Sequence, residues 1–161
     1  GHAIVAYIVK NVNCPTKVSI IPRTNGALGF SQSTFDEDKQ MYSKSELEDQ
    51  MKVMLGGRVA EKIIFNEITT GAYDDLEKLN NIAYEYVSKY GMDMKIKNVI
   101  KINDSHSEYF MKIVDNQVKY LINNLEIDTI SIINSNIDKL NKLANLLLEK
   151  ETIIMDDFNN L

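Results

Sequence analysis

Apolar side chains recur at helical spacing over most of the chain and fall into separate segments. The first, residues 2–11, is almost continuously apolar, as in a helix that is buried on most sides. Segments with one apolar face follow at 44–65 and at about 74–90, and the pattern resumes from Glu108. A further helix is expected after Asn136, which suits an N-cap position. The pattern predicts a mainly α protein.

Start and stop signals delimit two of these helices. Ser43 and Glu46 have the spacing of a capping box, in which each side chain satisfies a free amide at a helix start. Gly91 follows the 74–90 segment at a C-terminal cap position. Gly56 and Gly57 lie inside the 44–65 segment, where each costs roughly 1 kcal/mol relative to alanine. Two such residues together predict close packing of that helix against another backbone.

Two short β-type runs predict a small antiparallel sheet near the N-terminus. Residues 17–22 end at a proline, and residues 27–32 follow across a turn at 23–26. Glycines in and beside the second run weaken it as an interior strand. We therefore expect the second strand to lie at an edge of the sheet or beside another backbone.

The chain of 161 residues is predicted to form a single domain. Its least readable part is the connector 92–106, in which residues 99–102 have the pattern of a short strand. This connector is expected to separate an active-site lobe, residues 1–91, from a helical lobe, residues 107–161. Residues 152–161 are expected to form a last short turn of helix.

Composition excludes several classes of function. The net charge of −5 and the mixing of lysines with acidic residues argue against nucleic-acid binding. Proteins or peptides are the expected partners. The single cysteine, Cys14, is assigned a structural role because it has no partner for a disulfide or a thiolate metal site. No apolar run approaches the roughly 20 residues that span a bilayer, so this segment is expected to be soluble by itself.

Several motifs resemble the zinc peptidase domain of the FtsH family, the membrane-anchored ATP-dependent proteases. They occur in the family's order and at about its spacing, so the resemblance covers essentially the whole chain. The four strongest are VSIIPR at 18–23, GALGF at 26–30, LGGRVAE at 55–61 and TTGAYDDL at 69–76. Gly1-His2 matches the end of the family's His-Glu-x-Gly-His motif, although this dipeptide alone is more often an unstructured terminus or tag remnant.

The resemblance implies a zinc site. His2 would be one ligand and Asp75 another, while the first histidine and the general-base glutamate would precede Gly1. No catalytic residue would then lie in this chain, which is expected to be inactive, with weak or absent zinc. Asp75 falls in the first turn of a predicted helix, where the helix dipole favours an ionised carboxylate; its alternative role is an ordinary helix-start acid. Asp74 points about 100° away and is assigned to capping or solvent.

The resemblance also implies a substrate-binding strand formed by Ala27, Leu28, Gly29 and Phe30. Strand addition uses backbone hydrogen bonds and tolerates many side chains, which suits a protease that accepts varied unfolded chains. The alternative is an ordinary edge strand.

The remaining polar candidates have simpler interpretations. His106 lies in a polar run with no ligand-spaced neighbour and is assigned to a surface loop. Arg58 and Glu61 stand at i, i+3 on a predicted helix, which suits an ion pair or a subunit contact, with a structural role favoured.

By resemblance, the parent protein is a zinc metalloendopeptidase that degrades unfolded or membrane proteins as a homo- or hetero-hexamer. Its ATPase domain and membrane segments would lie upstream. ATP would bind only to that ATPase domain, and only the membrane segments would anchor the protein in a bacterial, mitochondrial or plastid membrane. The chain has no Gly-x-x-x-x-Gly-Lys-Ser/Thr motif for ATP. One alternative is a non-catalytic module that holds a ring together. A weaker one is an unrelated helical adaptor.

Overall fold

The computed structural model describes residues 1–22, 30–33, 41–93 and 108–158. Helices form most of this part of the chain, and a small antiparallel sheet accompanies them, so the predicted fold class is confirmed. In chain order the elements are α1 (His2–Ile8), β1 (Pro15–Ser19), β2 (Phe30–Ser33), α2 (Lys44–Phe65), the 3₁₀ helix η1 (Thr70–Ala72), α3 (Tyr73–Ser88), α4 (Glu108–Ser135), α5 (Ile137–Lys150), β3 (Thr152–Ile154) and α6 (Met155–Phe158).

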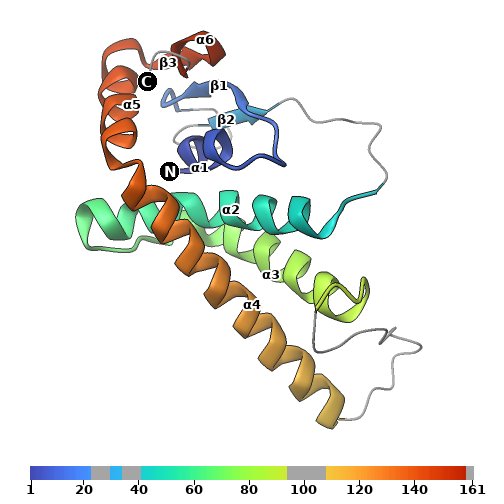
Figure 1. The fold of residues 1–161 in the computed structure, drawn as a ribbon. Coiled ribbons are helices and arrows are strands. Elements are labelled where there is room, and N and C mark those ends of the chain that lie inside the picture. The colour runs from blue at the N-terminus through green and yellow to red at the C-terminus, as the bar shows by residue number, and fades with distance from the viewer. Residues whose placement is uncertain (23–29, 34–40, 94–107, 159–161) are drawn as a thin grey trace.

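Helix α2 lies at the centre of the helical layer and packs against α1, α3 and α4 (Figure 1). Helix α1 lies between α2 and the sheet, so its apolar side chains are covered from both directions. Each large apolar side chain that is fully buried in this way contributes about 1.5–3 kcal/mol. The fully buried members of the core include Ile4, Val5, Met51, Val59, Leu79, Tyr86, Val87, Val114, Ile133, Ile153 and Phe158.

The predicted start of α2 is confirmed, whereas α3 ends at Ser88, with Lys89 at its C-cap, two residues before the predicted end that Gly91 was expected to cap. The Glu46 carboxylate accepts a hydrogen bond from the Ser43 amide at 2.7 Å, and the Ser43 hydroxyl accepts one from the Glu46 amide at 3.3 Å. Helix α2 ends at Phe65, and its C-cap residue Asn66 has a left-handed φ of 53°. Gly91 has a φ of 61°, a conformation that glycine adopts without strain.

The adjacent glycines of α2 do allow close packing, as predicted. A Cβ atom on Gly56 would lie 3.0 Å from the Val5 Cγ2 methyl and 3.2 Å from the Gly1 carbonyl group. Helix α1 therefore approaches the backbone of α2 more closely than a side chain at position 56 would allow.

The sheet has three strands in the order β2-β1-β3, with both pairings antiparallel. Both predicted strands are present. Strand β1 ends at Ser19 rather than at residue 22, and β2 is described over Phe30–Ser33, while residues 27–29 of the predicted strand lie outside the described residues. At the end of β1, the Ser19 hydroxyl donates to the Glu151 carbonyl at 3.2 Å and accepts from the Ile21 amide at 3.2 Å. With these bonds in place, the chain bends at residue 21 and leaves the strand before the proline.

The C-terminal part contains an element that the sequence pattern did not predict. Residues 152–154 form β3 and pair with β1, and the short helix expected over 152–161 is represented by α6, while residues 159–161 lie outside the described residues. The pairing places Thr152 opposite Ser19 and the buried Ile153 opposite Val18. Since α4 also packs on α2, the two predicted lobes are joined by contacts in both the sheet and the helical layer.

The end of α1 and the capping of α5 also differ from the prediction. Helix α1 ends at Ile8 rather than at residue 11, because Val9 already has an extended backbone. Asn136 occupies the N-cap of α5, but its side-chain amide donates to the Ile132 carbonyl of α4 at 2.8 Å and makes no cap bond. Among the described helices, none combines the length and apolar character needed to cross a membrane. The predicted strand at 99–102 lies outside the described residues.

Candidate metal centre

Two residues that are 73 positions apart in sequence meet beside α2. His2 begins α1, Asp75 lies in the first turn of α3, and their Nε2 and Oδ2 atoms are 2.9 Å apart. Their side chains are 39% and 30% exposed, so both groups remain accessible from solvent. The fold therefore brings together the two residues to which the sequence analysis assigned metal binding.

The surroundings of Asp75 favour its ionised form. The hydrogen bond from His2 lowers the pKa of this carboxyl group and outweighs the opposing effect of burial. Electrostatic interactions with His2 and Lys78 act in the same direction. An ionised carboxylate beside an imidazole nitrogen is a donor pair that zinc accepts.

Helix α2 supplies one wall of this site through Gly57. The His2 ring lies so close to the backbone there that a Cβ atom at position 57 would be 2.3 Å from the ring Cε1. The two side chains open into a cavity of about 140 Å³. It is lined by His2, Gly57, Arg58, Glu61, Gly71, Ala72 and Asp75.

A second contact from α2 supports the chain just before Asp75. The Glu61 carboxylate accepts hydrogen bonds from the Thr69 amide at 3.3 Å and from its hydroxyl at 3.0 Å. The Thr69 hydroxyl in turn accepts from the Gly71 amide at 3.2 Å, which caps η1. Within the described part of the chain, no ion pair joins Arg58 to Glu61.

Sequence reasoning did not assign Gly57 or Glu61 to this site. Their spacing of four residues places them on the same face of α2, but only the fold shows that His2 and Thr69 lie against that face. Asp74 is exposed, in agreement with its assignment to solvent. Phe30 lies in β2, while Ala27, Leu28, Gly29 and His106 lie outside the described residues.

The donor set at this site is incomplete by itself. Among the residues that the structure describes, no three His, Cys, Asp or Glu side chains form a group that could hold a metal ion. The two donors present are compatible with zinc, because ligand atoms of a tetrahedral zinc ion lie about 3.4 Å apart and the observed pair needs only a small outward shift. A further ligand would have to come from elsewhere in the protein.

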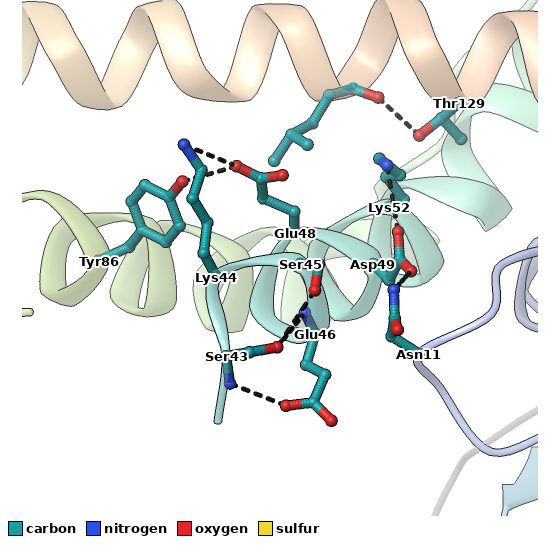
Figure 2. Close-up of polar contacts among 11 residues, drawn as sticks. Asn11, Ser43, Lys44, Ser45, Glu46, Glu48, Asp49, Lys52, Tyr86 and Thr129 are labelled. Atoms are coloured by element: carbon teal, nitrogen blue, oxygen red, sulfur yellow. Dashed lines mark hydrogen bonds and ion pairs between the residues drawn. The ribbon is translucent and has the colours of Figure 1, made fainter. Parts of the chain in front are cut away.

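Other carboxylates gather near the start of α2, where Figure 2 shows several separate polar clusters. In one, the Tyr86 hydroxyl donates to Glu48 at 2.6 Å, and Lys44 lies 3.8 Å from the same carboxylate oxygen. Burial and the bond to Glu48 raise the pKa of Tyr86. Both donors contact the same oxygen of Glu48, and among the described residues no three potential metal ligands form a group there.

Comparison with known proteins agrees with the motifs. Residues 1–161 match the model of peptidase family M41. The chain is 39% identical to an ATP-dependent zinc metalloprotease FtsH of Ruminiclostridium cellulolyticum, with all of the chain and 28% of that protein aligned. It is 37% identical to the FtsH of Clostridium perfringens, over 98% of the chain and 24% of that protein. The chain thus spans about a quarter of the length of these relatives.

Proposed function

Because the chain belongs to peptidase family M41, we propose that it is the proteolytic domain of a longer ATP-dependent zinc metalloendopeptidase. The observation that carries the proposal is the 2.9 Å approach of His2 Nε2 to Asp75 Oδ2 at an open cavity. Both are residue types that bind zinc, and they come from separate helices of the fold.

In this proposal His2 and Asp75 hold the metal together with a histidine that precedes Gly1. When bound, zinc supplies Lewis-acid activation of water near neutral pH. The general base would be a glutamate, also upstream of Gly1. The ionised state of Asp75 keeps a negative donor available, and the Glu61 contact to Thr69 fixes the turn from which Asp75 projects.

We propose that an extended substrate adds to the sheet along β2, using the segment Ala27, Leu28, Gly29 and Phe30. The support is topological: in the described part of the sheet, β2 pairs with β1 on one side only, so its other edge is available. Backbone pairing at an edge accepts many sequences, which suits the degradation of unfolded or membrane proteins.

The finer properties of the whole protein belong to the same proposal. We expect an upstream ATPase domain and membrane segments, and assembly into a homo- or hetero-hexamer. Residues 1–161 alone supply two of the expected zinc ligands, so this segment is expected to bind zinc weakly and to cleave no peptide bond. Zinc titration of the isolated segment by calorimetry would contradict this if it showed tight binding at one equivalent.

The test of function is ATP-dependent degradation of casein by the full-length protein. The wild-type protein should degrade casein, and Asp75→Ala should abolish degradation with loss of zinc. Asp74→Ala is the matched control, because Asp74 is the adjacent acid, is exposed and does not line the cavity; it should keep both properties. A wild-type protein that forms a ring without degrading casein would support the non-catalytic assembly module instead.

A further inference from the structure

Among the described residues, Gly57 of α2 lies directly against the ring of the candidate ligand His2. A Cβ atom at this position would lie 2.3 Å from the His2 Cε1 atom and 2.9 Å from each ring nitrogen. Such distances are well inside van der Waals contact, so the imidazole occupies the volume that any other residue's side chain would fill.

We propose that Gly57 is a positioning residue for His2: the missing side chain lets the imidazole lie against the backbone of α2 with Nε2 directed at Asp75. This inference rests on the proposed zinc site. Gly57 itself contributes no ligand atom, and its effect on the metal passes entirely through the orientation of the His2 ring.

If a side chain were added at position 57, the His2 ring would be the group that moves. The His2 ring turns about two single bonds and is partly exposed, so rotation toward solvent would relieve the overlap without moving a helix. That rotation would also take Nε2 away from Asp75. An alanine at position 57 should therefore damage the metal site while the fold persists, since alanine is the better helix former.

The neighbouring Gly56 provides a matched contrast. It lies in the same helix, but its added Cβ would meet the buried Val5 methyl and the Gly1 backbone instead of a mobile ring. Those groups belong to the contact between α1 and α2, so relief would require the two helices to separate. Alanine at position 56 should lower the stability of the fold first.

The experiment compares Gly57→Ala and Gly56→Ala in the full-length protein. Zinc affinity is measured by competition with a chromophoric chelator, the cobalt-substituted protein is examined by visible absorption, and the melting temperature is measured without metal. Gly57→Ala should weaken zinc binding at least about tenfold and change the cobalt spectrum, with its melting temperature kept or raised. Gly56→Ala should lower the melting temperature and cost less zinc affinity than Gly57→Ala.

Unchanged zinc affinity and an unchanged cobalt spectrum in Gly57→Ala would overturn the inference. If Gly57→Ala fails to fold, the double variant His2→Ala with Gly57→Ala decides, because removal of the ring should restore the melting temperature of His2→Ala alone. A double variant that stays unfolded would also overturn the inference. The Asp75→Ala variant distinguishes a failure of the proposed zinc site from a failure of the role of Gly57. If Asp75→Ala still binds zinc, the proposed metal site is wrong. If Asp75→Ala loses zinc while Gly57→Ala binds it normally, only the role of Gly57 is rejected.

Discussion

Asp49 and Asp75 are two carboxylates that contact residues from the N-terminal part of the chain, and their surroundings differ. Asp49 is only 7% exposed, and accepts hydrogen bonds from Asn11 at 2.8 Å and Lys52 at 3.1 Å (Figure 2). Asp75 accepts one from His2 and faces an open cavity. A carboxylate with donors on both oxygens is fixed within the fold. One with an unused acceptor position beside a cavity can bind a further positive group.

The comparison predicts its largest effect for zinc binding. Asp75→Asn removes the negative donor while keeping the size of the side chain. Zinc affinity of the full-length protein should fall by more than about 100-fold, while the free energy of unfolding without metal changes by less than about 1 kcal/mol. Chelator competition and urea unfolding measure the two quantities. A large loss of metal-free stability would place Asp75 with Asp49 as a structural carboxylate.

The opposite result is expected for Asp49→Ala. This change removes the acceptor of the Lys52 ammonium, whose side chain is only 17% exposed, and one partner of the exposed Asn11 amide, at a cost of about 2–3 kcal/mol. Zinc affinity per folded molecule should stay unchanged. Urea unfolding measures the loss, and Asp115→Ala, which removes an exposed acid from α4, serves as the control. Zinc loss comparable to that of Asp75→Asn would remove the distinction between the two carboxylates.

A smaller effect on zinc binding is expected from Thr69, which bonds to Glu61 of α2 just before the helix that carries Asp75. Thr69→Val keeps the shape of the side chain but removes the hydroxyl that bonds Glu61 and Gly71. The loss of this cap should cost about 0.5–1.5 kcal/mol and weaken zinc binding a few-fold. The same zinc competition assay measures it, with the exposed Thr70→Val as control. Equal zinc affinity in both variants would show that the Glu61 contact does not influence the metal site.

The smallest effect on stability is expected for Asp157. Like Asp49, this carboxylate has two hydrogen-bond partners, but it lies near the surface. Hydrogen bonds from Lys150 and from the Ile154 amide lower its pKa. The stability it contributes is therefore present above the ordinary aspartate pKa, and is lost as the pH falls through the lower folded value. Amide exchange at Ile154 should accelerate in that acidic range, and Asp157→Asn should remove this pH dependence. Identical pH profiles for both proteins would contradict the assignment.

Local signals in the sequence were sufficient to locate the main helices, although the end of α1 was misplaced. Ser43 and Glu46 mark the start of α2 because a capping box involves only neighbouring residues. The end of β1 was misplaced because the side chain of Ser19 bonds to Glu151, which lies far away in sequence. Strand β3 was missed for the same reason, since three residues carry little pattern until their partner strand is known.

The candidate site was harder to predict from the sequence than the helices were. His2 and Asp75 were selected by their resemblance to family motifs, and the structure adds that they approach each other. The roles argued for Gly57 and Glu61 depend on contacts with His2 and Thr69 across separate elements. A periodic pattern describes one face of a helix, but it does not identify what that face meets.

The central position of β1 has a consequence for biosynthesis. Its two neighbours in the sheet are β2, which follows closely, and β3, which is separated from β2 by helices α2, α3, α4 and α5. One edge of β1 must therefore stay unpaired until these helices and β3 have been translated, and this long-range closure is a slow kind of folding step. An exposed strand edge recruits other chains. The nascent protein would be most open to aggregation or chaperone capture in the interval before Thr152–Ile154 emerge.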